Sequence, residues 1–466
     1  MSQIPADLLE KSPLITARGY QLWREMQQHP HAPIWRTVAG DRMQAEDLSH
    51  LNRYREALHA GRERCPTDVP PDHILAWLHA KRDKVADFRL RLPDGFKAEH
   101  HWQNIPTMSR EDIATRLEYL IPDDADLEQM LVYRTAGTTG HALQVPHHVQ
   151  AVTSYLPMIE LALQQYGLQS DFSAGQVANF LVGAQVNTVT YATVLSAWQQ
   201  AGFAKLNIHP NEWRKADDAQ QFFSQLNPAM LTGDPISFSE MLRQQIPAQP
   251  RTLITTAVAM SNGLKQHLQE HYHAPVIDWY SLTETGPLAY ACPLGHGYHQ
   301  LPHDVFIEVL DAEGFPVSDR QVGEITVTGG RNPFIPLLKY RTGDWGRMDH
   351  TPCPCGDPMP NLLDLEGRVP VLFRAADNSI VNPVDLSRIL RRFPFVQHSF
   401  RQLADRSCEL IIRPIRNGSA SEKQAVARAL GELMGELPLD IRYDNELGNR
   451  SRGKVLPYQS ELLLEE

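Results

Sequence analysis

The sequence predicts an α/β protein with a large N-terminal α/β domain of layered sheets and a small C-terminal α+β lid domain. Apolar segments of strand length alternate with helical segments between residues 177 and 282, and strand-like segments dominate after Pro302. A new run of strands and helices then begins near Gly367. Alternation of this kind is typical of a largely parallel sheet covered by helices. We expect an N-terminal domain over residues 1–367, with a helical lead-in over 1–130, and a lid over 368–466.

Composition and charge are those of a soluble globular protein. The 466 residues are 42% hydrophobic and 21% charged, with a formal net charge of −11. This acidic balance gives no electrostatic footprint for nucleic acid or an anionic membrane. The N-terminal stretch "MSQIPADLLEKSP" has no basic region followed by an apolar core, and no apolar run approaches the length that spans a bilayer. We expect a cytoplasmic protein without nucleic-acid or membrane partners.

The lead-in is predicted to be helical. Apolar residues recur at helical spacing in "LNRYREALHAGRER" and "ILAWLHAKRDKVADF". In "NIPTMSREDIATRLEYL" the spacing predicts a helix with Ser109 as its N-cap and Asp112 at the third helical position. This pair is a variant of the capping box, in which each side chain binds the other residue's backbone.

From Leu131 onward the pattern changes to alternating strands and helices. The expected strands are "VANFLVG", "AMLTGD", "TLITTAVAM" and "PVIDWYSLT". The expected helices between them are "TYATVLSAWQQAGF" (residues 190–203), "ISFSEMLRQQI" and "NGLKQHLQEHY". After Pro302, the strand-like segments are "DVFIEVLD", "GEITVTG" and "PLLKYRTGDWGRM".

Five short motifs carry the candidate chemistry. In chain order they are "YRTAGTTGHA" (133–142), "WYSLTETG" (279–286), "YRTGDWG" (340–346), "LEGRV" (365–369) and "RSRGKVLPY" (450–458). Each motif alone is compatible with an ordinary turn or a solvated strand end. Their order and spacing resemble the adenylate-forming superfamily of acyl-CoA synthetases, luciferases and adenylation domains. The lead-in "WQNIPTMSREDIATRL" is similar to that of the phenylacetate–CoA ligase branch, and the resemblance covers roughly residues 102 to 457.

The first motif is expected to bind the β- and γ-phosphates of ATP. Backbone N–H groups of a glycine-rich turn converge on a phosphate, and threonine hydroxyls add donors. The stretch is not a Walker loop, which needs a Gly-Lys-Ser/Thr ending. The family's loop lysine is replaced by His141, which we interpret as a solvated loop residue. By resemblance, the phosphate-binding residues are Thr135, Gly137, Thr138, Thr139 and Gly140.

The second motif is expected to contribute to both nucleotide binding and catalysis. The resemblance implies that Tyr280 offers its ring to adenine and that Thr283 places a hydroxyl near the α-phosphate. Glu284 supplies a carboxylate oxygen, the type of ligand that Mg²⁺ prefers.

The remaining motifs are expected to complete the site. The resemblance implies that Asp344 accepts hydrogen bonds from the ribose hydroxyls and that Arg368 reaches the ribose or a phosphate. Lys454 would bring a cation to the carboxylate and the α-phosphate as charge develops between them.

The function implied is ATP- and Mg²⁺-dependent adenylation of a small, aromatic carboxylic acid, followed by transfer of the acyl group to a thiol. Polar Gln185, Asn187 and Thr188 stand in the apolar stretch "FLVGAQVNTVTYATV", which by analogy lines the acyl pocket. The acceptor is left open between CoA, the phosphopantetheine arm of an acyl carrier protein and an amine. The turn "RAADNSIVNP" lacks the glycine that the branch shows on its pantetheine path, and Pro370 stands beside the Gly-Arg hinge. The oligomeric state is also left open, with a homodimer as one alternative.

A non-catalytic nucleotide- or acyl-binding relative is the alternative from another class. Retention of both Glu284 and Lys454 argues against it, because a protein without turnover could lose either residue.

Three of the five cysteines, together with nearby histidines, suggest a metal site. Thiols in a cytosolic protein are more often free or metal-bound than disulfide-bonded. Cys353 and Cys355 form a Cys-Pro-Cys pair, and Cys292 precedes His296 and His299. Three cysteines and one histidine suit a closed structural zinc site. We choose Cys292, His299, Cys353 and Cys355, since relatives in the branch show a histidine nine residues before the position of Glu308, with His296 as the alternative ligand.

Overall fold

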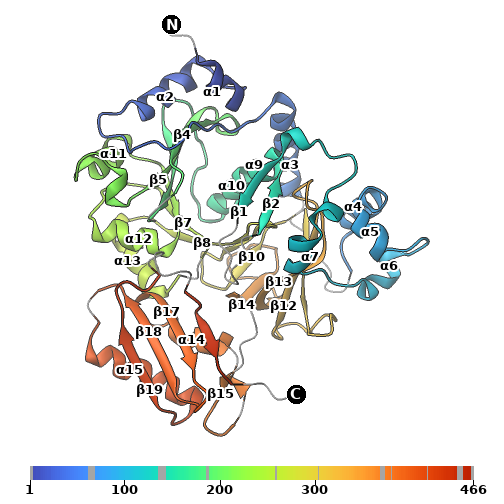
Figure 1. The fold of residues 1–466 in the computed structure, drawn as a ribbon, viewed down its shortest axis with the longest axis vertical. Coiled ribbons are helices and arrows are strands. Elements are labelled where there is room, and N and C mark those ends of the chain that lie inside the picture. The colour runs from blue at the N-terminus through green and yellow to red at the C-terminus, as the bar shows by residue number, and fades with distance from the viewer. Residues whose placement is uncertain are drawn as a thin grey trace. The chain divides into compact units, whose positions relative to one another are not determined.

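The fold divides into two compact units, each built from separate stretches of the chain. The first comprises residues 1–42, 171–278 and 370–466, and the second comprises 43–170 and 279–369. The computed structural model (Figure 1) describes residues 4–60, 69–134, 143–184, 188–257, 260–302, 304–367, 373–378, 380–381, 383–416, 418–448 and 455–462. Among these residues no helix has both the length and the apolar character needed to cross a membrane. The predicted domain limits at 367 and 368 stay a prediction.

A mostly parallel sheet forms the centre of the first unit and confirms the predicted α/β class. Its strands run in the order β8-β7-β6-β3-β5-β4, and all neighbours are parallel except the edge pair β4 and β5. The strands are β3 (Val177–Gly183), β4 (Tyr191–Leu195), β5 (Ala201–Asn207), β6 (Met230–Gly233), β7 (Thr252–Thr255) and β8 (Val276–Leu282).

Helices pack against this sheet and bury an apolar core. Helix α2 lies against β4 and β5, and helix α12 lies against β3 (Figure 1). The core between them includes Phe180, Phe222 and Leu231, each fully buried. The helices are α1 (Ala6–Lys11), α2 (Ala17–Gln27), α11 (Asp218–Leu226), α12 (Pro235–Arg243) and α13 (Asn262–Tyr272), with short 3₁₀ turns at Ser196–Trp198 and Pro210–Glu212.

The predicted helix over residues 190–203 is wrong. This stretch forms β4, a short turn and the start of β5, and the two strands pair antiparallel. Gln199 and Gln200 turn the chain at positive φ angles of 50° and 66°, which end any helix. The sequence "TYATVL" is rich in β-branched and aromatic residues, which fit a pleated sheet better than a helix.

The C-terminal part of the first unit has the predicted α+β composition. A four-stranded sheet in the order β19-β18-β17-β20 carries helices α14 and α15, and a two-stranded hairpin of β15 and β16 precedes it (Figure 1). Helix α15 begins with a capping box between Ser419 and Glu422. The elements are β15 (Phe373–Arg374), β16 (Ile380–Val381), α14 (Pro383–Leu390), β17 (Phe395–Gln402), β18 (Cys408–Pro414), α15 (Ala420–Met434), β19 (Leu439–Tyr443) and β20 (Tyr458–Ser460).

An antiparallel sheet forms the second unit, as the strand-like texture after Pro302 predicts. Its order is β11-β12-β13-β14-β10-β9, followed by the last residues of β8. A separate hairpin pairs β1 with β2. The strands are β1 (Leu131–Arg134), β2 (Gln144–His147), β9 (Gly286–Ala291), β10 (Tyr298–Gln300), β11 (Val305–Leu310), β12 (Gly323–Gly329), β13 (Leu337–Asp349) and β14 (Asn361–Gly367).

Helices of the second unit form much of the described chain before β1 and also follow β2. The backbone N–H of Ser109 donates to Asp112 Oδ2 at 2.7 Å, so the predicted capping box opens α7. The helices are α3 (Ala45–Ala60), α4 (Asp72–Arg82), α5 (Ala86–Arg91), α6 (Ala98–His101), α7 (Arg110–Thr115), α8 (Leu117–Leu120), α9 (Val149–Thr153) and α10 (Tyr155–Gln165), with 3₁₀ turns at Trp102–Asn104 and Leu127–Gln129.

A buried ion pair ties helix α3 to the sheet of the second unit. The Arg331 guanidinium donates from Nε and Nη2 to Asp304, with distances of 2.6–3.1 Å. Tyr54 Oη of α3 donates to the same carboxylate at 2.9 Å. The Arg331 side chain is 3% exposed, so its charge depends on this partner.

We expect Arg331→Met to lower the free energy of unfolding by about 3–5 kcal/mol, because it leaves Asp304 charged and without its cation. The matched control is Arg401→Met, which breaks a partly exposed pair with Glu461 and should cost about 0–1 kcal/mol. Urea unfolding of both variants checks the prediction. Equal losses would contradict it.

Candidate active site and metal centre

The second and third motifs meet through a buried hydrogen bond. Tyr280 Oη, on β8, donates to Asp344 Oδ2, on β13, at 2.9 Å. The backbone N–H of Asp344 also donates to Thr342 Oγ1 at 3.1 Å, and that hydroxyl donates to the carbonyl of Ile325. Burial raises the pKa of Tyr280, and the Asp344 carboxylate raises it further. Tyr280 therefore stays a neutral donor, and it holds one oxygen of Asp344.

Glu284 is held by a second phenol of β13. Tyr340 Oη donates to Glu284 Oε1 at 2.5 Å, and both side chains are buried. Burial raises the pKa of Tyr340 well above its usual value, with the Glu284 charge adding to the effect. Arg110 Nη1 lies 3.7 Å from the same Oε1. A buried carboxylate needs such partners, so Glu284 lies in a polar environment suited to a charged side chain.

The turn after Glu284 is shaped by glycine. Gly286 has φ +70°, a conformation that L side chains rarely adopt. A Cβ atom there would also lie 3.3 Å from Arg331 Cδ and Tyr155 Cε1. Thr283 stands at the start of this turn with a half-buried side chain, so its hydroxyl can reach a ligand.

Arg341 of the "YRTGD" motif has a structural role. Its Nε donates to Glu324 Oε2 at 2.6 Å, and the backbone N–H of Gly343 donates to Oε1 of the same carboxylate at 3.0 Å. Gly343 has φ +75°, which places its N–H toward Glu324. This arrangement fixes the turn that carries Asp344.

Several predicted site residues lie outside the described residues. They are Thr135, Gly137, Thr138, Thr139, Gly140, His141, Gln185, Asn187, Arg368 and Lys454. Their assignments stay predictions. Thr188 is described and half-buried.

The predicted acceptor turn is the hairpin of β15 and β16. Asn378 takes φ +73° within it, a conformation that favours glycine. Asparagine is one of the few other residues that tolerate this region. Arg374 exchanges hydrogen bonds with the side chain of Gln402 at 2.8 and 2.9 Å, so the hairpin is anchored to β17. The missing glycine does not prevent the turn.

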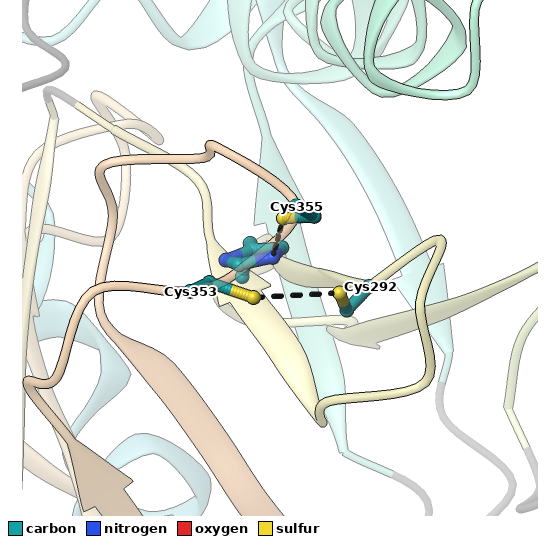
Figure 2. A group of neighbouring side chains, drawn as sticks. Cys292, Cys353 and Cys355 are labelled. Atoms are coloured by element: carbon teal, nitrogen blue, oxygen red, sulfur yellow. Dashed lines mark hydrogen bonds between the residues drawn. The ribbon is translucent and has the colours of Figure 1, made fainter.

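The four predicted metal ligands lie together. Cys292 Sγ lies 3.7 Å from Cys353 Sγ, and His299 Nε2 lies 3.1 Å from Cys355 Sγ. All four ligand atoms lie within 4.8 Å of one another. Figure 2 shows Cys353 and Cys355, from one loop, converging with Cys292 from another stretch of chain. His296, the alternative ligand, is exposed and does not belong to the group.

The donor set fits a tetrahedral zinc ion. Zinc–sulfur bonds of about 2.3 Å imply an Sγ–Sγ separation of about 3.8 Å in a tetrahedron, close to that between Cys292 and Cys353. The backbone N–H groups of Leu294 and Asp357 lie 3.4 Å from the sulfurs of Cys292 and Cys355, respectively. His299 Nδ1 lies 3.4 Å from the Met359 carbonyl, so Nε2 is left for a metal.

Two residues near Glu284 were not predicted from the sequence to contribute to the site. The sequence places Arg110 directly after the N-cap Ser109 and gives it no further role, and the family resemblance assigns no role to Tyr340. A signal did exist for Tyr340, which begins the "YRTGD" motif. No local signal identifies Arg110, because it lies 174 positions from Glu284 in the sequence and only tertiary packing brings the two side chains together.

Comparison of the sequence with known proteins does not identify its family. No family model matches the chain. One curated protein, chalcone synthase cfoA of Aspergillus candidus, is 24% identical over 192 residues. The match covers 36% of this chain and 7% of that protein, so the chain spans only a small part of its length.

Solved structures give a clear similarity of fold. A 2-hydroxyisobutyryl-CoA ligase in the postadenylation state, in complex with R3-HIB-AMP, aligns with a TM-score of 0.61 and 13% identity over 90% of both chains. The same enzyme with 2-HIB-AMP gives 0.60 and 15%, again over 90% of both chains. Its open conformation with 2-HIB-AMP and CoA gives 0.51 and 14%, over 88% of this chain and 91% of that one. The chain therefore has the fold of this CoA ligase, in agreement with the fold that its motifs predict.

Proposed function

We propose that this protein is an AMP-forming acid–thiol ligase, which adenylates a small carboxylic acid with ATP and passes the acyl group to a thiol. The observation that carries the proposal is the pairing of Tyr280 with Asp344 and of Tyr340 with Glu284. Two motifs separated by about sixty positions thereby meet in the unit that also contains the half-buried Thr283. The fold shared with a ligase whose structures hold acyl adenylates supports it.

Each residue has a role in the proposed reaction. The carboxylate of the acid attacks the α-phosphorus of ATP, pyrophosphate leaves, and AMP becomes the leaving group for the thiol. Thr283 would donate to the α-phosphate, and Asp344 would accept from the ribose with the oxygen that Tyr280 does not hold. Glu284 would bind Mg²⁺, which neutralises phosphate charge when bound. Lys454 would stabilise the charge that develops during adenylation.

Arg110 adds a cation beside Glu284. The family's loop lysine is missing at His141, so the phosphates need positive charge from elsewhere. The Arg110 guanidinium lies 3.7 Å from Glu284 and is 28% exposed, which leaves it able to turn toward an anion. We infer that it compensates for the absent lysine.

The finer assignment is a phenylacetate–CoA ligase-like enzyme in the cytoplasm that acts on an aromatic acid, with CoA as the acceptor. The hairpin supports CoA as the acceptor, because the turn forms, with Asn378 at positive φ and Arg374 anchored to β17, without the glycine that the branch shows. A carrier-protein arm or an amine is the alternative acceptor. We further propose a structural zinc ion at Cys292, His299, Cys353 and Cys355, since four protein ligands leave no open position.

The reaction is tested by ATP–pyrophosphate exchange across a panel of aryl and short-chain acids, followed by thioester formation with CoA or a phosphopantetheine-bearing carrier protein. Lys454→Ala should lower exchange by about 10²–10³-fold, as expected for loss of a charge that acts in the transition state, while calorimetry shows ATP binding nearly intact. The control is Lys423→Ala, which removes a lysine whose Nζ donates to the Ile441 carbonyl. Exchange at the wild-type rate in Lys454→Ala would exclude the assigned role.

Tyr340→Phe should reduce adenylation by about 10- to 100-fold, because Glu284 loses a hydrogen bond of the charged type, worth about 1.5–3 kcal/mol. Tyr54→Phe is the matched control, since it removes a phenol from another buried carboxylate, Asp304. Magnesium titrations of the exchange rate measure the effect. Equal rates for the two variants would show that Glu284 does not act in the reaction.

Purified protein should contain about one zinc ion per chain. Cys353→Ser should lower both the zinc content and the melting temperature, whereas Cys408→Ser, at a buried cysteine outside the group, should keep the metal. Elemental analysis and thermal melts check this. Metal-free protein with an unchanged melting temperature would refute the zinc site.

A further inference from the structure

His147 is a buried histidine beside the proposed catalytic turn. It is the last residue of β2, pairs with Leu131 of β1, and is 5% exposed. Its ring packs at right angles to that of Tyr133, with the ring centroids 4.9 Å apart. Its imidazole also lies near the backbone of Thr283. The neighbouring His148, in contrast, caps α9 by accepting from the Gln150 N–H at 3.1 Å.

Neither ring nitrogen of His147 has a hydrogen-bond partner among the described residues, although both atoms are buried. An unsatisfied buried polar atom costs about 1–3 kcal/mol, and most buried side-chain polar atoms in proteins are paired. Burial lowers the pKa of the imidazole to about 4, and the Thr283 backbone offsets this only in part. Near neutral pH the ring therefore has one N–H donor and one acceptor nitrogen, and among the described residues only the Thr283 backbone acts on it.

This position is better suited to a ligand than to a core side chain. A core residue at the same place could be phenylalanine, which would fill the space without unpaired nitrogens. The chemistry next to the ring is that of an anion site, since Thr283 and Glu284 are the residues assigned to the α-phosphate and its metal. A neutral N–H can donate to a phosphate oxygen there without adding a fixed charge beside the metal.

We propose that His147 is a substrate-binding residue, whose imidazole N–H donates to an oxygen of the nucleotide's α-phosphoryl group during adenylation. The inference rests on the proposed function. It extends that function to a residue that lies outside the five motifs. Bound nucleotide would give the ring the hydrogen bond that its nitrogens lack among the described residues.

The test compares His147→Phe and His147→Gln in ATP–pyrophosphate exchange and in thioester formation from pre-made acyl adenylate. His147→Phe keeps a ring but removes both nitrogens, and it should lower kcat for exchange by about 10- to 100-fold, the loss expected for one hydrogen bond to a charged group. His147→Gln restores an N–H and should recover activity to within about fivefold of wild type. Thioester formation should change by less than about threefold in both, because the phosphoryl transfer is already complete.

Two controls separate this role from a structural one. The melting temperature of His147→Phe should equal or exceed that of the wild type, since two unpaired buried nitrogens are removed. His148→Asn keeps an N-cap acceptor on α9 and should leave exchange unchanged.

Full exchange activity in His147→Phe, with exchange present in the wild type, would overturn the inference and leave the proposed function intact. An effect confined to the Michaelis constant of the acid would place His147 in the acyl pocket and overturn its assignment to phosphate. No exchange by the wild type with any acid would overturn the proposed function, and the inference with it.

Discussion

Two buried carboxylates held by tyrosine hydroxyls determine the arrangement of the candidate site. Glu284 and Asp344 are both almost fully removed from water, and each accepts a hydrogen bond from a phenol of the opposite motif. The two hydrogen bonds run in opposite directions between the motifs. Tyr340 of β13 donates to Glu284, and Tyr280 of β8 donates to Asp344 of β13. Burying a carboxylate without such a partner is costly, so neither motif can move without disturbing the other.

The metal group adds a second link between the same parts of the second unit. Cys292 and His299 lie on the segment that follows the Thr283–Gly286 turn, and Cys353 and Cys355 lie between β13 and β14. A tetrahedral ion there would join β9 and β10 to the end of β13. The Arg331–Asp304 ion pair lies beside Gly286 and supports the turn from another side. A rigid frame of this kind suits a site that must orient a carboxylate against phosphorus.

Charge balance explains why the site includes residues outside the motifs. The chain is acidic overall and has a histidine where the phosphate loop of the related enzymes has a lysine. In the proposed reaction, a triphosphate would therefore need donors from other elements. Arg110 at the start of α7 and His147 at the end of β2 are candidates from two different elements, one charged and partly exposed, the other neutral and buried.

The sequence by itself determined the α/β class, the antiparallel texture after Pro302, the capped helix at Ser109 and the order of the motifs, because periodicity and capping are local properties of a chain. Only the tertiary structure decided that residues 190–203 form strands, since sheet pairing outweighed a helical interpretation. It also decided that His299 rather than His296 lies with the cysteines. Tertiary packing likewise brings Tyr340 to Glu284. Arg110 and His147 lie beside the Thr283–Gly286 turn for the same reason. Burial and contact between residues far apart in the chain create these relations, and no local pattern encodes them.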